Sequence, residues 1–283
     1  MTDLVERLVP EELWTLFRRV VPPTEVIRPQ GGGRRRAGDR ECLAAIIFVA
    51  TSGCTWRQLP PVFGPAWPTV YRRFARWSRD RVWARLHRVI LDELGARGEL
   101  DWSRCAIDSV SVRAAKGPMT KPNPTDRAKL GSKIHLITDR NGLPLSLGIS
   151  GANMHDSLGL APLVRGIPPI RSRRGPRRRR PAKLHADKGY DYDHLRRWLR
   201  ERGIAHRIAR KGVEPSQRLG RHRWVVERTV AWLSGCRRLH RRYERKAEHF
   251  LAFVGIAAAL IGHRRLAQRL NAKRHQAEEL AET

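Results

Sequence analysis

The stretch SKIHLITDRNGLPLSLGIS, residues 132–150, consists of two runs of alternating character separated by Asn141-Gly142. Alternation with a period of two is typical of a strand with one buried face. An Asn-Gly pair favours the tight turn that joins two antiparallel strands. The stretch therefore predicts a β-hairpin, and the segments on either side of it decide what kind of sheet it belongs to.

Further strands are predicted on both sides of this hairpin. RCAIDSVSVR, residues 104–113, alternates in the same way and predicts a strand before it. A short helix is expected over 157–165, followed by strand AKLHAD, a helix ending at Gly203 and strand AHRIA. Three antiparallel strands followed by strands joined through helices indicate an α/β fold with a mixed sheet flanked by helices.

Residues 1–97 read as a separate helical unit. ECLAAIIFVATSGC, residues 41–54, is apolar enough for a central helix, and the arginine-bearing stretch 67–94 splits into two helices at Ser78, a candidate N-cap. Such a unit with outward arginines is typical of a helix-turn-helix-like DNA-binding domain, although solvated basic helix faces are commoner. The arginines expected to face outward are Arg72, Arg73 and Arg76.

The charge points to a polyanionic partner. Lysine and arginine total 57 against 27 acids, a formal charge of +30, and such self-repulsion is tolerated when the partner is nucleic acid. A membrane is disfavoured, because the longest apolar stretch, residues 250–261, is too short to span and reads as a buried helix. The N-terminus does not resemble a signal peptide, and the four cysteines are scattered singly, which suits reduced thiols in the cytoplasm.

Two aspartates fall on predicted strands. Asp108 lies on the same strand face as Ala106 and Val110, where an ionised carboxylate needs a cationic partner. It is either a ligand, a frayed strand end or half of an ion pair with an arginine. Asp187 follows KLHA at the carboxyl end of a parallel-strand candidate, the edge where open sheets bind ligands. Its alternative is a helix cap, for which Asp191 and Asp193 are better placed.

Glu227 is the third notable acid, in HRWVVERTVAWL, residues 222–233. Taken alone it would be a surface ion pair with Arg223, four residues earlier on the same helix face. The surrounding apolar residues make the helix apolar nearly all round, so Glu227 is expected to be hard to place in solvent.

Three carboxylates without Cys or His beside them suit hard cations and favour Mg²⁺ or Mn²⁺ over Zn²⁺. Two such ions about 4 Å apart would serve the attacking and leaving oxygens of a phosphodiester. In a basic chain the lysines and arginines then hold the DNA backbone while the acids hold the metal. No small-molecule cofactor is indicated.

With these residues in place, the chain resembles the DDE transposases of bacterial insertion sequences, specifically the fifth insertion-sequence family and the related fourth. The resemblance rests on IDSVSVRA, GSKIHLITDRNGLPL, ANMHDS, LHADKGYD and RWVVERTVAWLSGCRRLHRRYE, and covers roughly residues 8–268 in order. It implies a ribonuclease H-like domain with Asp108, Asp187 and Glu227 as its metal-binding triad. It also implies magnesium-dependent cleavage at transposon ends, transfer of the freed 3′-hydroxyl to target DNA, and a homodimer while working.

The signature around the glutamate is incomplete. In the family it reads Tyr, two residues, Arg, three residues, Glu, six residues, Lys. Arg223 and Glu227 match this pattern, but Gly220 stands at the position of the tyrosine and Ser234 at the position of the lysine. Arg237 and Arg238 lie one turn beyond Ser234 and offer replacement cations. Other candidate DNA contacts are Lys133 and Lys188, each with a surface or packed role as the alternative, as for His135. His155 and Asp156 fall in a loop, where Asp156 assists the site or caps the next helix.

The expected organisation is a DNA-binding domain at 1–97, a catalytic domain at 98–268 and a polar tail at 269–283. The arginine-rich stretch RSRRGPRRRR, residues 171–180, is expected to be a mobile basic loop that cannot pack. The expected function is transposition, in the bacterial cytoplasm near the nucleoid. Two rivals stay open: a catalytically impaired relic that only binds DNA, and a basic RNA-binding protein. Duplex DNA is the expected partner, as inverted repeats and target.

Overall fold

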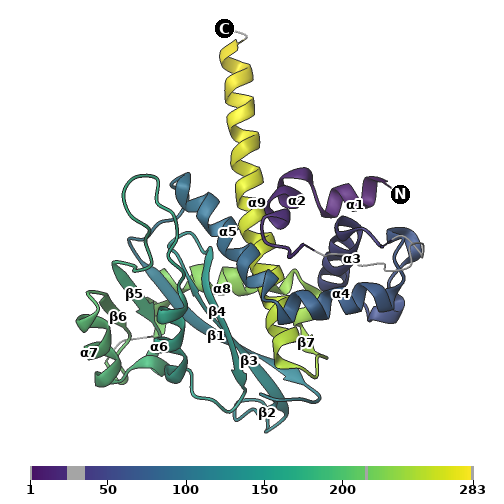
Figure 1. Ribbon diagram of the computed structural model, residues 1–283. Helices are drawn as coiled ribbons and strands as arrows, with labels where there is room; N and C mark the ends of the chain where they lie inside the picture. Colours follow the sequence, from purple (N-terminus) through teal and green to yellow (C-terminus); the bar gives the residue numbers. More distant parts are fainter. Residues whose placement is uncertain (1, 24–35, 214–215, 282–283) are drawn as a thin grey trace.

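The computed structural model describes residues 2–23, 36–213 and 216–281, with side chains described for 4–23, 36–213 and 224–269. Helices of the N-terminal third lie to one side of a sheet, and a long C-terminal helix passes between them and extends beyond the body (Figure 1). The helical third comprises α1 (Thr2–Leu8), α2 (Glu11–Arg18), α3 (Asp39–Ser52), α4 (Trp67–Arg79) and α5 (Val82–Ala96), with the 3₁₀ turns η1 (Trp56–Gln58) and η2 (Pro61–Phe63) between α3 and α4.

The rest of the chain builds a mixed seven-stranded sheet. Its main strands run in the order β4-β3-β1-β5-β6, while the short β2 pairs with β3 and the short β7 with β1. Strand β3 is antiparallel to both β4 and β1, and β1, β5 and β6 are parallel, as the strand pattern predicts. The strands are β1 (Cys105–Ala114), β2 (Lys121–Pro122), β3 (Leu130–Thr138), β4 (Pro144–Gly151), β5 (Lys183–Ala186), β6 (Ala205–Ile208) and β7 (Arg241–Arg242); the helices are α6 (Ser157–Gly166), η3 (Lys188–Tyr190), α7 (Asp193–Glu201), α8 (Ser216–Ser234), η4 (Arg237–Leu239) and α9 (Ala247–Ala281).

The predicted hairpin is confirmed, and a buried carboxylate organises its turn. Gly142 has φ +86°, a conformation that glycine adopts without strain. Asp139 is fully buried, and its Oδ1 accepts hydrogen bonds from the backbone N–H groups of Asn141 (2.9 Å) and Leu143 (2.8 Å). Burial raises the pKa of Asp139 to about 6, against the opposing effect of its backbone donors.

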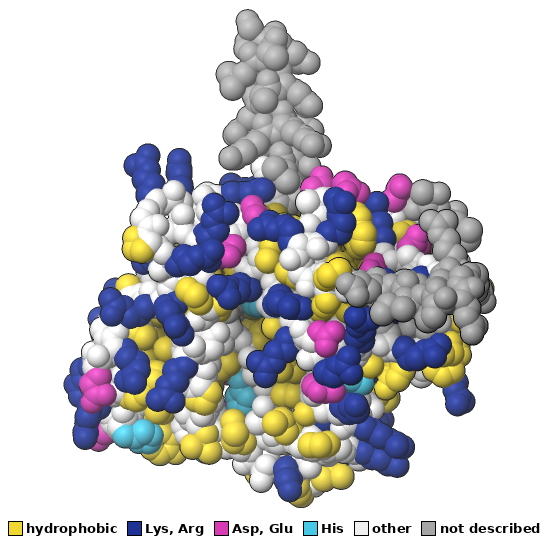
Figure 2. All heavy atoms as spheres, in the orientation of Figure 1, with side chains coloured by type: hydrophobic (Ala, Val, Ile, Leu, Met, Phe, Trp, Pro, Cys, Tyr) yellow, Lys and Arg dark blue, Asp and Glu magenta, His cyan; other side chains and the backbone are white. Residues whose placement is uncertain are grey.

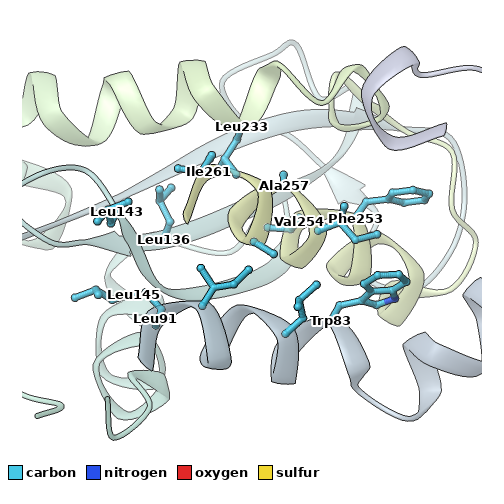
Figure 3. Packing of buried hydrophobic residues seen from close by; sticks show 14 of the residues in the cluster. Trp83, Leu91, Leu136, Leu143, Leu145, Leu233, Phe253, Val254, Ala257 and Ile261 are labelled. Atoms are coloured by element: carbon cyan, nitrogen blue, oxygen red, sulfur yellow. The ribbon is translucent and has the colours of Figure 1, made fainter. Parts of the chain in front are cut away.

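One hydrophobic core joins the helical third to the sheet. Helix α9 packs along α5, and Gly262 allows the close approach because an added Cβ would lie 2.7 Å from a methyl group of Ile90. Figure 3 shows the α9 side chains Phe253, Val254, Ala257 and Ile261 between α5, which contributes Trp83 and Leu91, and the neighbouring α8 residue Leu233. The boundary expected at residue 97 therefore does not coincide with a gap in the core.

The apolar stretch expected to be a buried helix lies in α9. Residues Ala247–Arg269 are long and apolar enough to cross a membrane, but 78% of this window is buried inside the protein. It is a core helix, as predicted. The same helix continues to Ala281, through the segment expected as a polar tail.

Two details of the helical third differ from expectation. Ser78 does not cap a helix: it lies inside α4, donates to the carbonyl of Phe74 (2.7 Å) and accepts from the indole N–H of Trp83 (3.2 Å), while Arg81 with φ +54° precedes α5. Arg73 does not face outward, because it is buried and forms an ion pair with Asp39. A stripe of apolar residues does not reveal that an acid on another helix will draw an adjacent arginine inward.

The arginine-rich stretch is also not the unpacked loop that composition predicts. A two-hydrogen-bond β-bridge joins Ile170 to Arg178, and several of its arginines contact neighbouring elements. Arginine differs from other charged residues in having a planar, weakly hydrated group that packs on carbonyls and rings.

Candidate active site

Asp108 lies on β1, and Asp187 directly follows the neighbouring parallel strand β5. In the register of β1 and β5, Cys105 pairs with Leu184 and Ala106 with His185. Continuing that register by two residues brings Asp108 opposite Asp187, immediately beyond the end of β5. Directly opposed residues of neighbouring strands point to the same face. This register therefore brings the two carboxylates to the same face of the sheet at the carboxyl end of β5.

Asp187 also caps a short helical turn. Its Oδ1 accepts a hydrogen bond from the N–H of Gly189 (2.8 Å) at the start of η3. A Cβ at Gly189 would lie 3.0 Å from that oxygen, so the absence of a side chain there keeps room beside the carboxylate. Asp187 is thus a helix cap, the alternative that the sequence offered for it, and this hydrogen bond orients its carboxylate. Asp191 instead binds Arg196 and the N–H of Lys211.

Glu227 is exposed, and the expectation that it would be hard to place in solvent is wrong. Helix α8 contacts β1, β3 and β5 through one buried stripe, and Val225 and Ala106 line the same narrow crevice. Helical geometry turns Glu227 away from that stripe, since it lies two residues beyond Val225. The stripe consists of Val225, Val226, Thr229 and Leu233.

The two tryptophans among the described α8 side chains lie on the exposed side of the helix. Trp224 and Trp232 are 49% and 38% exposed, and the Arg228 guanidinium lies over both rings, 4.4 and 4.6 Å from their centroids. Arg228 also donates to the carbonyl of Asn141 (2.8 Å), which ties the hairpin turn to α8. The apolar character of the helix suggested that these tryptophans would be buried, because the sequence does not show that an arginine lies between the two rings as a cation–π partner.

The donor chemistry fits a divalent cation at two of three positions. Adjacent ionised carboxylates suit Mg²⁺ or Mn²⁺. In the described part of the chain, however, no three His, Cys, Asp or Glu side chains gather closely enough to hold a metal ion. Glu227 is carried by the helix that covers this part of the sheet, but it does not join the two aspartates in this arrangement.

Lys133 and His135 lie on the opposite face of the sheet from Asp108. Asp108 pairs with Leu136, whereas His135 pairs with Ser109 and Lys133 with Ser111. Lys133 is not a surface lysine: its Nζ donates to Asp156 Oδ1 and to the carbonyl of Met154, both at 2.8 Å. Its expected DNA contact is therefore replaced by an internal ion pair.

Asp156 is the residue whose role the sequence least revealed. It stands at the N-cap position of α6 but makes no side-chain capping bond. Burial would raise the pKa of Asp156, but hydrogen bonds from Lys133 and Ser109 and the Lys133 charge lower it below its ordinary value. The hydrogen bond between Asp156 and Ser109 holds the part of β1 that carries Asp108. Because the two residues are far apart in the sequence, no local pattern predicts this contact.

The other expected DNA contacts have varied surroundings. Arg72 and Arg237 are exposed, Arg76 is half-buried near Asp80, and Lys188 is half-buried in η3. Arg238 is buried and donates to Glu244 (2.8 Å), so the expectation that it replaces the missing lysine is wrong. Gly220 and Arg223 lie outside the residues whose burial and contacts are described. Ser234 donates to the carbonyl of Ala231 (2.7 Å).

Comparisons with known proteins agree on one family. A family model described as "Transposase DDE domain" matches residues 102–261, and one described as "Putative transposase of IS4/5 family" matches residues 9–87. The "Putative transposase for insertion sequence element IS402" of Burkholderia cepacia is 40% identical over 222 residues, 78% of this chain and 92% of that protein. An uncharacterized 16.2 kDa protein of the same insertion element is 38% identical over 112 residues, 39% of this chain and 76% of that protein.

Among solved structures, a Mos1 transposase paired-end complex with the left transposon end is 13% identical, with a TM-score of 0.25, over 69% of this chain and 65% of that one. This similarity is too low to establish a shared fold. The sequence matches decide the matter: with a DDE-domain model over more than half of its length and a 40% identical relative across most of both sequences, the chain belongs to the DDE transposases of bacterial insertion sequences.

Proposed function

We propose that this transposase binds the inverted repeats of its own element, cleaves the DNA at the ends and joins the freed 3′-hydroxyl to target DNA. The observation that carries the proposal is the parallel register of β1 and β5, which, continued by two residues, brings Asp108 opposite Asp187. In a chain of net charge +30, two acids at that position can hold a metal ion while the lysines and arginines contact the DNA backbone.

The catalytic domain is proposed to be ribonuclease H-like. The strand order β4-β3-β1-β5-β6, with three antiparallel strands followed by two parallel ones, supports this assignment. Asp108 and Asp187 would hold Mg²⁺ or Mn²⁺, two ions when the site is complete, with Glu227 as the third ligand. The metal, when bound, would activate the attacking oxygen and stabilise the leaving one.

The residues of the chain position the reaction. Asp187 is oriented by the Gly189 N–H, and β1 is held beside Asp108 through the Ser109–Asp156–Lys133 connection. Phosphoryl transfer depends chiefly on such positioning and on electrostatic stabilisation, and requires no covalent enzyme intermediate.

Duplex DNA is proposed to contact cations around this site and on the helical unit. Figure 2 shows lysine and arginine side chains scattered across the visible face, with fewer acids among them. Helices α3 and α4 would act as a helix-turn-helix-like reader, and the active form would be a homodimer acting near the nucleoid in the cytoplasm. The proposed contacts are Arg72, Arg76, Lys188, Arg223 and Arg237.

The triad is tested with Asp108→Asn, Asp187→Asn and Glu227→Gln. Each change should lower magnesium-dependent cleavage of a supercoiled plasmid carrying the element's ends by roughly a thousandfold or more, because metal-borne charge stabilisation is worth several kcal/mol. Binding to a labelled duplex should stay within about threefold of the parent, since phosphate contacts dominate affinity.

The three variants separate the possible failures. Full cleavage by Glu227→Gln alone would remove that residue from the site while retaining the two aspartates. A parent protein that binds the duplex but never cleaves, in Mg²⁺ or Mn²⁺, would favour the DNA-binding relic, to which Gly220 and Ser234 already point.

A further inference from the structure

The loop between α6 and β5 carries seven arginines within residues 171–180, and the proposed cleavage site uses none of them. Its backbone is closed by two hydrogen bonds of 2.8 Å between Ile170 and Arg178, and Gly175 (φ +82°) lies near its tip. Ile170 is fully buried, so the base of the loop is part of the core.

A single acid clamps the loop to the end of α5. Asp92 accepts from the backbone N–H of Arg171 (2.8 Å) and from the Arg177 guanidinium (2.8 and 3.0 Å). Gly95 allows this approach, because an added Cβ would lie 2.1 Å from the carbonyl oxygen of Arg171. An ion pair and a backbone bond on the same buried carboxylate hold the loop in one orientation.

The next three arginines fasten the returning arm of the loop. The Arg178 guanidinium lies 5.6 Å from the ring centroid of Trp102. Arg179 donates to the carbonyl of Arg165 at the end of α6 (2.8 Å), and Arg180 donates to the carbonyl of Arg202 after α7 (3.1 Å). Arg177 to Arg180 therefore all contact this chain itself.

The other three arginines are left on the outside. Arg171, Arg173 and Arg174 are exposed, and no carboxylate in the described part of the chain pairs with their guanidinium groups. In Figure 2, dark blue side chains project at the upper left, where Figure 1 shows the loop beside the end of α5. Like charges displayed on an anchored loop repel each other, and that repulsion is relieved by a polyanion.

We infer that this loop is a second contact surface for the backbone of duplex DNA, separate from the cleavage site. It precedes β5, whereas Asp187 follows it, so the two surfaces lie at opposite ends of that strand. Guanidinium groups match phosphate oxygens in a two-pronged geometry, and a loop already held in place loses little freedom on binding. The inference rests on the proposed function, because it assumes that the chain binds DNA.

The test compares two variants of equal charge. One is Arg171→Gln, Arg173→Gln and Arg174→Gln together. The control is Arg197→Gln, Arg200→Gln and Arg207→Gln, which removes three exposed arginines from α7 and β6. The affinity for a duplex of random sequence, about 40 base pairs long, is measured by fluorescence anisotropy at several salt concentrations.

Each lost phosphate contact lowers the slope of log K against log salt by about 0.9. The loop variant should therefore lose about two to three units of slope, and the control less than about one. Equal slopes in the two variants would overturn the inference while leaving the proposed function intact. A parent that does not bind the duplex at all would instead overturn the proposed function, and the inference with it.

A further variant separates an anchored loop from mere charge. Asp92→Asn raises the net positive charge by one but removes the ion pair with Arg177. If anchored presentation matters, this variant binds the duplex several-fold more weakly than the parent, although its charge has risen. Binding as tight as or tighter than the parent's would show that the anchoring contributes nothing.

Discussion

Arg237 and Arg238 are consecutive residues with opposite surroundings. Arg237 is exposed, whereas Arg238 is buried with its Nε 2.8 Å from Glu244 and its NH1 3.0 Å from the carbonyl of Cys54. Both partners of the ion pair have less than a tenth of their side chains exposed. Arg238 is therefore a structural residue that connects η4, the turn after α8, to the segment that follows α3.

Two single variants should separate these roles. Arg238→Gln should lower the free energy of unfolding by about 3–5 kcal/mol, because it leaves Glu244 buried without its partner. Arg237→Gln should change it by less than about 0.5 kcal/mol. In urea unfolding followed by tryptophan fluorescence, equal stability of the two variants would contradict this assignment. If Arg237 contacts a phosphate, only its variant loses about 0.9 of the salt slope.

The same contrast explains which site residues could be predicted. The positions of Asp108 on β1 and of Asp187 directly after β5 could be predicted, because strand alternation and the run KLHA are local signals. The burial of Arg73 and Arg238 was not predictable, because Asp39 and Glu244 become their partners only through tertiary packing. In a chain so rich in arginine, exposure is a poor default for any one of them.

At the scale of elements, the strands of the sheet were predictable because period-two patterns are local and Asn141-Gly142 specifies the turn. The orientation of α8 was not predictable, because its two exposed tryptophans are stabilised by Arg228 between them rather than by burial. The attachment of α5 to the hairpin likewise has no sequence signal. It includes a hydrogen bond of His87, whose Nε2 lies 2.9 Å from the carbonyl oxygen of Pro144 at the start of β4.

His87 should make this junction sensitive to acid. Burial lowers the pKa of His87 to about 4, although the hydrogen bond to Pro144 opposes the shift. The unfolded chain, with an ordinary histidine pKa near 6.5, then takes up a proton before the folded one. Stability is therefore present above about pH 6.5 and is lost as the pH falls towards 4, by up to about 3 kcal/mol from this residue.

The variant His87→Gln can still donate to the Pro144 carbonyl but does not titrate. Its free energy of unfolding should fall less steeply than the parent's between pH 6.5 and 4, by about 2–3 kcal/mol over that range. At pH 8 the comparison measures only the change in packing. Parallel stability curves for the two proteins across the acid range would exclude His87 as a source of acid sensitivity.

At the scale of the whole molecule, the helical unit and the sheet unit share one core. Side chains of α2 to α5, the sheet and α9 belong to a single cluster of buried residues. Helix α5 supplies Trp83, Ile90 and Leu94 to the groove that α9 fills. The proposed DNA-reading unit is thereby fixed relative to the proposed cleavage site, which suits an enzyme that must cut at a set distance from the sequence it binds.

This shared core predicts a single cooperative unfolding transition for the full chain. Residues 1–97 expressed alone would expose the face of α5 that α9 covers, and burial of apolar surface is worth about 25 cal/mol per Å². The fragment should therefore lack a cooperative thermal transition, and residues 98–283 should behave likewise without α5. Differential scanning calorimetry of the full chain and both fragments checks this. Two separate transitions, each reproduced by one fragment, would show instead that residue 97 is a true domain boundary and that α9 merely rests against α5.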